Sequence, residues 1–415
     1  MLKAVTLIAL TGTTLLGFNQ APAAPTQTKS VTSDQQIDPP SFNLISDTEI
    51  IADGHTFTSW QDLYESGYYG FEENRCATRP IPHNGFDSQR GGADCSFNNT
   101  TIRDIYDPSV VKYRVPVVVH VIQRSNGTGA MTDERVQSQI DILNEDFLAM
   151  SGTNGAPGND GQIEFYLATV DPQGNPTTGI TRSTNNTWFN DGGAYYNTLA
   201  WDTNRYLNIY TNNGGGALGY VPDLPQGGIA GSNSDRVVIL ESTFGRNTPF
   251  SPFNLGRTVT HEVGHYLGLW HTFDNGCGTT SGCYTSGDRI CDTNRESSPT
   301  SGCPTSRVSC GTQAPIHNYM DYSDDICMNQ FTVEQNNRMR CSLINYRPNL
   351  FTEESTGGCS IADLSEVFGR LDNFDVSAFI NLFSAQGTDV DFNNDGSWNF
   401  FDVSIFLQAY NAGCP

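Results

Sequence analysis

The pattern of hydrophobic and polar residues changes character along the chain. Residues 25–92 are polar and punctuated by Pro and Gly, with short apolar islands and no sustained period. A β-branched run follows at 117–119 and continues through Val121 and Ile122, which is typical of a buried strand. Pro116 stands just ahead of this run, where a strand tolerates a missing N–H.

The next segment has the period of an amphipathic helix. Its apolar side chains recur at helical spacing, at Val136, Ile140, Leu143 and Phe147, behind a possible cap at Thr132 and Asp133. Further strands are predicted at 163–169, 206–210 and 237–240, and further helices at 255–267 and 332–343. Strands, one helix behind them and a second helix that carries a candidate site predict an α+β domain.

The first residues determine the expected compartment. Lys3 precedes an apolar run at 4–16, and small residues follow around Pro22. This arrangement predicts a signal peptide at 1–24. The run is too short to span a bilayer in the mature protein, and no later stretch approaches its apolar length. We therefore expect a secreted product, extracellular or associated with the cell surface, without a membrane span.

Length and net charge limit the number of domains and the class of partner. At 415 residues the chain fits two or three units, and its net charge of −23 disfavours nucleic acid as a partner. Behind the signal peptide, the core-poor stretch at 25–92 is a candidate pro-segment, with a disordered linker as the alternative. A catalytic domain is expected at 93–352, a short linker at 353–358 and a separate module at 359–415.

One segment, HEVGHYLGLWH, carries the strongest signal for chemistry. His261 and His265 lie one turn apart on a helix, so both imidazoles can reach one ion. Gly268 lets the chain leave the helix, and His271 then becomes the third ligand. Three protein nitrogens leave a fourth position open for water, which is the mark of a catalytic zinc. Glu262 is placed to hold that water and act as general base.

A second motif, NYMDY, places Met320 at 49 residues beyond His271. Met320 would form an apolar floor beneath the ligating imidazoles. Tyr322 would point its hydroxyl at the metal and stabilise the oxyanion of the tetrahedral intermediate. Ordinary core packing is the alternative for both residues.

With these motifs the sequence resembles the pappalysin family of metzincins. The resemblance extends over roughly 113–350 and rests on HEVGHYLGLWHTF, on NYMDYSDD, on pieces near Gly287 and Asp292, and on the helix at 331–340. It implies a metzincin-type domain with a twisted mixed sheet, a backing helix, an active-site helix and an irregular lower subdomain. It also implies structural calcium held by Asp288, Asp292 and Thr293.

The resemblance implies a zinc endopeptidase acting on protein or peptide substrates. Water attacks the scissile carbonyl, and Glu262 passes the proton to the leaving amine. We expect an extended substrate paired to an edge strand near 228–233. Resembling enzymes favour Arg just after the scissile bond, and Asp324 or Asp325 near that pocket would explain the preference.

Eleven cysteines in an exported protein indicate bridges plus one residue left over. The family's interleaved pairing maps onto Cys283–Cys310 and Cys303–Cys327, which leaves Cys277–Cys291 as a local bridge. Further expected pairs are Cys359–Cys414, which brackets the last module, and Cys95–Cys341.

Cys76 remains unpaired within the predicted pro-segment. Its thiolate would occupy the open zinc position and hold the enzyme latent until it is cut away. The family has a related motif, usually with Gly after the Cys, where this chain has Ala77. A spare thiol or a different pairing is the alternative.

The last module contains an EF-hand-like calcium loop. Oxygen-bearing side chains stand at loop positions 1, 3, 5, 9 and 12, with Gly at position 6: Asp391, Asn393, Asp395, Asn399 and Asp402. An echo of its helix start 27 residues earlier indicates paired loop–helix elements that resemble dockerin repeats. An uncharged turn between helices is the alternative. Docking to a cohesin-like scaffold and simple anchoring both stay open.

The alternative function is a calcium-dependent, scaffold-attached or adhesive protein with zinc hydrolase activity on a non-protein substrate. The presence of Glu262 argues against an inert site, because a binding module needs no general base.

Overall fold

The computed structural model describes residues 42–46, 49–52, 55–57, 75–78, 95, 108, 111–355, 360–364, 371, 373–387, 390–393 and 395–413. The expected signal peptide, most of the expected pro-segment and the expected Cys359–Cys414 bridge lie outside these residues. The chain divides into units at 1–38 and 39–415, and all described residues belong to the second. Within this described part, no helix has the length and apolarity to cross a membrane.

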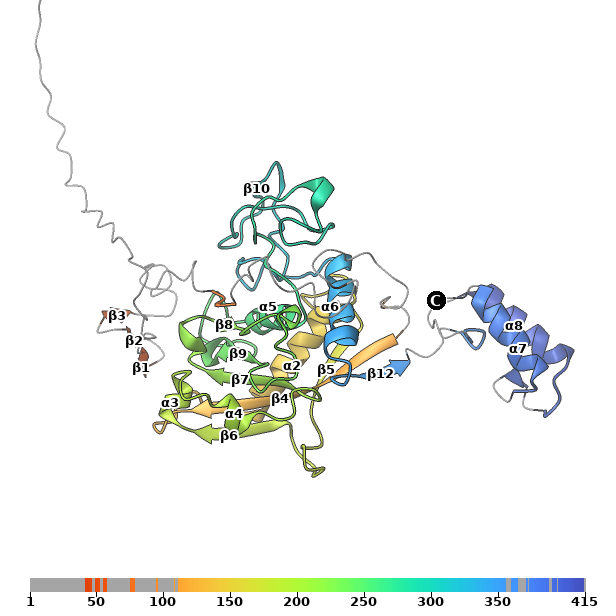
Figure 1. Cartoon of the computed structure of the whole chain (residues 1–415), viewed down its shortest axis with the longest axis horizontal. Helices are drawn as coiled ribbons and strands as arrows, with labels where there is room; N and C mark the ends of the chain where they lie inside the picture. Colours follow the sequence, from red (N-terminus) through yellow and green to blue (C-terminus); the bar gives the residue numbers. More distant parts are fainter. Residues whose placement is uncertain are drawn as a thin grey trace, which may run out of the picture. The chain divides into compact units, whose positions relative to one another are not determined.

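A seven-stranded mixed sheet organises the main domain (Figure 1). Its strands are β4 (Val111–Gln123), β5 (Ile163–Leu167), β6 (Ile180–Thr184), β7 (Leu207–Asn212), β8 (Gly219–Tyr220), β9 (Val237–Leu240) and β12 (Thr352–Ser355). Strand β4 runs parallel to β5, β6 and β7, β9 runs parallel to β7, and β8 and β12 join antiparallel at the edges. The β-branched run of the sequence is the centre of β4, and it is buried.

Three long helices lie on the same side of this sheet in Figure 1. They are α2 (Asp133–Phe147), α5 (Arg257–Tyr266) and α6 (Val333–Tyr346). Helix α2 buries its predicted apolar face, and Thr132 caps it by accepting from the backbone of Arg135. Helix α2 packs on β5 and α5, and α5 packs on β8 and β9. Helix α5, which carries His261 and His265, is therefore held between α2 and the edge of the sheet formed by β8 and β9.

The remaining elements are short. They are α3 (Asn186–Phe189), α4 (Tyr196–Leu199), the 3-10 turns η2 (Gly214–Gly216), η3 (Pro225–Gly227), η4 (Glu241–Thr243) and η5 (Thr280–Gly282), and the hairpin β10 (Val308–Ser309) with β11 (Thr312–Gln313). Ahead of the main domain, β1 (Phe42–Ser46), β2 (Glu49–Ala52) and β3 (His55–Phe57) form a three-stranded antiparallel sheet.

Two expectations about strands are wrong. The segment 228–233 forms turns with left-handed backbone at Gly228 and Gly231, so it is not the edge strand, and β8 occupies that position. The expected linker at 353–358 begins too early, because residues 353–355 pair with the start of β4. The described side chains of this strand are exposed, so backbone pairing formed it without a hydrophobic signal.

The irregular segment between α5 and α6 is crosslinked differently from the expectation. The structure contains Cys277–Cys310 and Cys283–Cys291, so the expected Cys283–Cys310 and Cys277–Cys291 pairs are wrong. The η5 turn directly precedes Cys283 and brings it back to Cys291, while the β10–β11 hairpin presents Cys310 to Cys277. The expected Cys303–Cys327 and Cys95–Cys341 pairs are both present.

The C-terminal module contains two helices, α7 (Asn373–Ser384) and α8 (Phe400–Ala412). Phe379 and Phe406, equivalent positions of the 27-residue repeat, stack with ring centroids 4.1 Å apart. They share a small core with Ala362 and Val390. The internal repeat of the sequence thus becomes a pair of facing helices with a core of its own.

Candidate metal centre and active site

Three histidines converge at the centre of the main domain. His261 and His265 come from successive turns of α5, and Gly268, with a φ of 96°, turns the chain so that His271 joins them. His265 Nε2 lies 3.1 Å from His261 Nε2 and 3.0 Å from His271 Nε2. All three side chains are buried.

The second nitrogen of each ring fixes its orientation. His261 Nδ1 donates to the carbonyl of Tyr319 at 2.7 Å, and His265 Nδ1 donates to that of Leu269 at 2.8 Å. His271 Nδ1 lies 3.2 Å from a carboxylate oxygen of Asp274. Burial and the neighbouring imidazoles lower the pKa of His261 and His265 well below the usual value. This lowered pKa favours the neutral form of these two rings, which is the form that binds a metal.

The donor set fits zinc. Tetrahedral ligation at 2.0–2.1 Å places ligand nitrogens about 3.3 Å apart, close to the observed separations. A fourth donor, the sulfur of Cys76, completes a group whose ligand atoms all lie within 4.8 Å of one another. Imidazole and thiolate ligands suit zinc, whereas calcium and magnesium take oxygen.

The NYMDY segment at 318–322 forms a turn, here called the Met-turn, that lies directly against α5. Met320 is fully buried, and a Cβ placed on Gly264 would come within 2.5 Å of its sulfur. Any side chain at this position would therefore displace the Met320 thioether. Tyr322 extends from the same turn, and its hydroxyl lies 3.2 Å from His271 Nε2.

Glu262 faces the same space from α5. Its Oε2 accepts from Thr78 Oγ1 at 3.2 Å and from Cys76 Sγ at 3.5 Å, while Oε1 is buried without a hydrogen-bond partner. Burial raises the pKa of Glu262 to about 8, although hydrogen bonds from Cys76 and Thr78 oppose the rise. A Cβ on Gly219 of β8 would approach Oε1 to 3.0 Å, so the edge strand needs glycine beside this carboxylate.

Residues 75–78 pass through the site along the edge strand. Cys76 forms a parallel bridge with Gly219, whose carbonyl accepts from the backbone of Ala77 at 3.1 Å. Cys76 is buried and is the free cysteine of the described residues. Burial and the adjacent Glu262 raise the pKa of its thiol. This segment occupies the space over Glu262 and the histidines.

Arg75, which the sequence did not single out, fills a pocket beside the site. Its guanidinium donates to the carbonyl of Ser323 and lies 3.8 Å from the buried carboxylate of Asp325. Its Cζ also lies 4.6 Å from the centroid of the Phe253 ring. The pocket thus offers a carboxylate, a carbonyl and an aromatic face to one basic side chain. In the sequence, the feature that could have indicated a role for Arg75 is its position directly before the unpaired Cys76.

The residues expected to bind calcium in the main domain are only partly brought together. Thr293 Oγ1 donates to Asp288 at 2.6 Å, whereas a carboxylate oxygen of Asp292 accepts from the backbone of Glu334 in the first turn of α6. Burial raises the pKa of Asp288 to about 7.

The expected calcium loop of the C-terminal module folds around its own side chains. The carboxylate of Asp391 accepts from the backbone of Asp395 and Gly396 at 3.1 and 2.8 Å. Asn399 and Asp402 cap α8 reciprocally. Asp402 is buried, and one of its oxygens has no hydrogen-bond partner.

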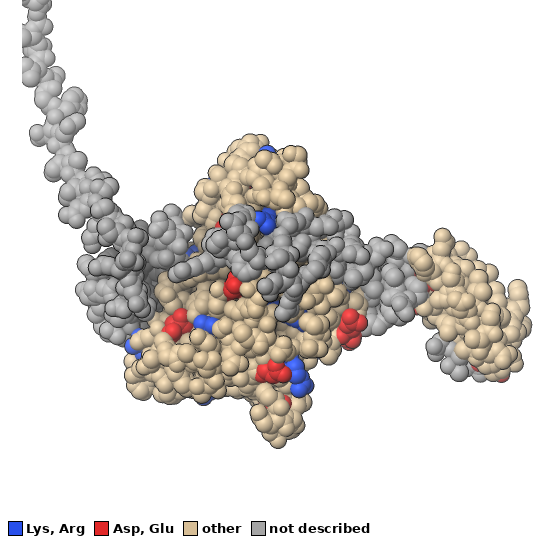
Figure 2. Space-filling model, viewed as in Figure 1, with Lys and Arg blue, Asp and Glu red and all other residues tan. Residues whose placement is uncertain are grey.

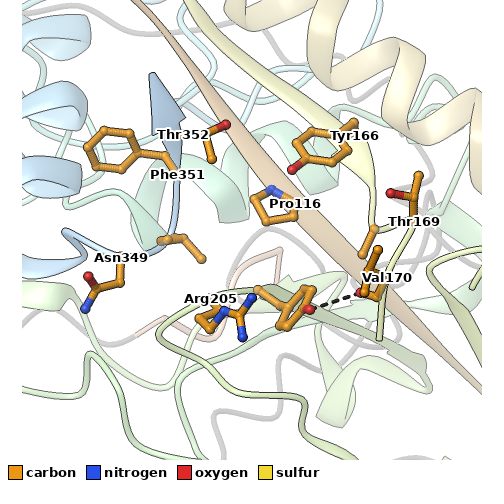
Figure 3. Close-up of a pocket in the computed structure, with 11 residues that line it drawn as sticks. Pro116, Tyr166, Thr169, Val170, Arg205, Asn349, Phe351 and Thr352 are labelled. Carbon is orange, nitrogen blue, oxygen red and sulfur yellow. Dashed lines mark hydrogen bonds between the residues drawn. The ribbon is translucent and has the colours of Figure 1, made fainter. Parts of the chain in front are cut away.

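One further cavity and one face of the surface carry fewer groups that could bind or catalyse than this site does. A cavity of about 220 Å³ lies between the start of β4, β5 and β12, and Figure 3 shows its rim. Arg205 is the one charged residue among those that line this cavity, and the lining contains no Asp, Glu or His. Figure 2 shows few charged side chains on one face of the described surface, some of them as adjacent acidic and basic groups, and no basic patch.

Comparison with known proteins gives consistent matches. A family model described as pregnancy-associated plasma protein-A, of the M43 peptidases, matches residues 194–344. An extracellular metalloprotease of Colletotrichum graminicola is 40% identical over 243 residues, which cover 56% of this chain and 77% of that protein. Extracellular metalloprotease 1 of Coccidioides posadasii is 39% identical over 235 residues, covering 54% and 75%. The structure of a promirolysin mutant from Tannerella forsythia matches with a TM-score of 0.51 and 36% identity, covering 58% of this chain and 85% of that one.

Proposed function

Because this chain belongs to the pregnancy-associated plasma protein-A family of metallopeptidases, M43, we propose that it is a secreted zinc endopeptidase that uses Glu262 as its general base. The observation that carries the proposal is the convergence of three buried imidazoles beside a buried carboxylate. Its substrates are proteins or peptides, and its relatives are extracellular enzymes.

In this proposal, each step of peptide hydrolysis is assigned to a small number of side chains. A zinc ion held by His261, His265 and His271 would supply a Lewis acid and lower the pKa of a bound water. Glu262 takes the proton of the attacking water and delivers it to the leaving amine. The hydroxyl of Tyr322 donates to the oxyanion that develops on the scissile carbonyl.

Metal removal tests this proposal. We expect 1,10-phenanthroline to abolish cleavage of a denatured protein by the processed enzyme, and one equivalent of zinc to restore it. The reason is that the imidazoles alone cannot acidify water. Restoration by calcium alone, or cleavage that persists after zinc loss is verified by elemental analysis, would contradict the proposed chemistry.

We also propose that the pocket filled by Arg75 selects a basic residue just after the scissile bond. Asp325 is fully buried at this pocket, and its other oxygen accepts from the backbone of Leu255 and Arg257. These bonds fix the carboxylate in place, and a substrate Arg would make the contacts that Arg75 makes. Substrate would lie along β8, since Ala77 already pairs with Gly219 there.

Asp325→Asn should change specificity more than activity. Asn keeps an oxygen for the backbone donors but removes the charge, so kcat/KM for peptides with Arg after the scissile bond should fall by roughly 100-fold. Matched peptides with Leu at that position should change by only about two-fold. Asp324→Asn, at a half-buried neighbour, is the control. An equal loss for both peptides would show that Asp325 supports the fold and does not select the substrate.

The remaining expectations extend this proposal. Residues 25–92 act as a pro-segment whose Cys76 occupies the fourth zinc position and whose residues 75–78 cover the histidines and Glu262. The 93–352 catalytic domain holds calcium at Asp288, with Thr293 and Asp292 as further ligands. The module at 359–415 is a dockerin-like calcium-binding unit that attaches the enzyme to a cohesin-like scaffold. The helix pair with its own core and the folding of the loop around the Asp391 carboxylate are compatible with a calcium-binding loop–helix unit.

Calcium binding by the module can be tested within its loop. We expect Asp391→Ala to lose one equivalent of bound calcium in titration calorimetry of the full chain, because position 1 supplies a carboxylate ligand. Ser397→Ala is the control, since position 7 binds through its backbone carbonyl. If both variants bind as many equivalents as the wild type, this loop is not a calcium site.

A further inference from the structure

Asp146, in the last turn of the backing helix α2, is buried at the junction of three elements. Its Oδ2 accepts from Thr260 Oγ1 at 2.6 Å. Its Oδ1 accepts from the hydroxyl of Tyr319 at 2.7 Å and from Arg257 Nη2 at 3.0 Å. One carboxylate therefore binds α5 at two positions and the Met-turn at a third.

Two of these donors flank His261. Thr260 precedes His261 on α5, and the carbonyl of Tyr319 accepts from His261 Nδ1 at 2.7 Å. The Nδ1 atoms of His265 and His271 contact Leu269 and Asp274 instead. The carboxylate of Asp146 thus connects the helix that carries His261 to the backbone group that orients its ring.

We propose that Asp146 is a positioning residue for the metal centre, which aligns the His261 imidazole by tying Thr260 to Tyr319. The inference rests on the proposed zinc ligation by His261. Because Glu262 follows His261 on the same helical turn, the same contacts set the direction of the general base.

The chemistry of the position favours this role over simple packing. A buried carboxylate is costly to desolvate, and a well-packed apolar side chain often stabilises a fold as well as a buried ion pair does. The Arg257 guanidinium compensates the charge, while the hydroxyls of Thr260 and Tyr319 add directional bonds that an apolar side chain cannot accept. These bonds fix relative orientation, which is what a tetrahedral ligand set requires.

The test measures metal binding as well as activity. In the full chain, Asp146→Asn should weaken zinc binding by roughly 10–100-fold in competition with a chelator. The visible spectrum of the cobalt-substituted protein should also change, because the ligand geometry is altered. Tyr319→Phe removes only one hydroxyl and keeps the carbonyl, so it should reproduce part of both effects with the fold intact. Asp141→Asn is the control, since this exposed carboxylate of α2 accepts from Gln137 of its own helix at 2.9 Å.

The outcomes separate this inference from the proposed function. Wild-type zinc affinity and cobalt spectrum in Tyr319→Phe and Asp146→Asn would overturn the inference, even if both variants melt at lower temperature. An equal loss in Asp141→Asn would also overturn it, because the effect would then belong to α2 as a whole. If His261→Ala leaves zinc affinity unchanged, the proposed ligand set fails, and this inference fails with it.

Discussion

Replacing Glu262 with Gln is expected to lower kcat for peptide hydrolysis by about 10²–10⁴-fold, the range that general acid–base catalysis contributes. Gln has nearly the same shape, so the contacts to β8 remain, but it cannot take a proton from water. Zinc content should stay at one equivalent, because the ligating nitrogens belong to other residues. KM should change little, since the lost interaction is made in the transition state.

The measurement is steady-state kinetics on the processed enzyme, with metal content determined on the same sample. Glu134→Gln is a matched control on the neighbouring helix α2, where this side chain is exposed in the first turn. Activity of Glu262→Gln within a few-fold of the wild type would remove Glu262 from the mechanism and require another base.

Replacing Cys76 with Ala is expected to give a precursor that cleaves substrate without processing. In the structure Cys76 Sγ donates to Glu262 and lies among the histidine nitrogens. Loss of this sulfur ligand should raise precursor activity by at least roughly 10–100-fold. Zinc gains an open coordination position, which is what water needs.

The experiment compares precursors in which processing has been excluded by mass spectrometry. Thr78→Val is the informative control, because it removes a second Glu262 contact and keeps the sulfur. That variant should stay latent. If Cys76→Ala is as latent as the wild type, burial of the cleft by the pro-segment is the lock and the thiol is not.

The parts of the fold that could be predicted are those encoded over short distances. The helical spacing of Val136, Ile140, Leu143 and Phe147 predicted the buried face of α2, and the β-branched run predicted the centre of β4. The convergence of His261, His265 and His271 follows from one helical turn and one glycine.

The features that were missed depend on contacts between distant segments. Strand β12 has exposed side chains and exists because the edge of β4 offers unpaired backbone groups. The partners of Cys277 and Cys283 depend on how a turn and a hairpin meet, which spacing alone does not determine. The role of Arg75 required the positions of Ser323 and Asp325, almost 250 residues away in the sequence. A role for Asp146 likewise becomes visible only from its hydrogen bonds to Thr260 of α5 and to Tyr319 of the Met-turn.

The Cys95–Cys341 bridge has a practical consequence for how damage to this enzyme would be detected. It joins residues 246 positions apart, and the loop it closes contains all three imidazoles. A single proteolytic nick within that loop leaves two fragments covalently linked. Nicked and intact chains would migrate together in non-reducing electrophoresis and separate only after addition of a thiol reductant. Gels of ageing preparations therefore reveal self-digestion only in the reduced lane.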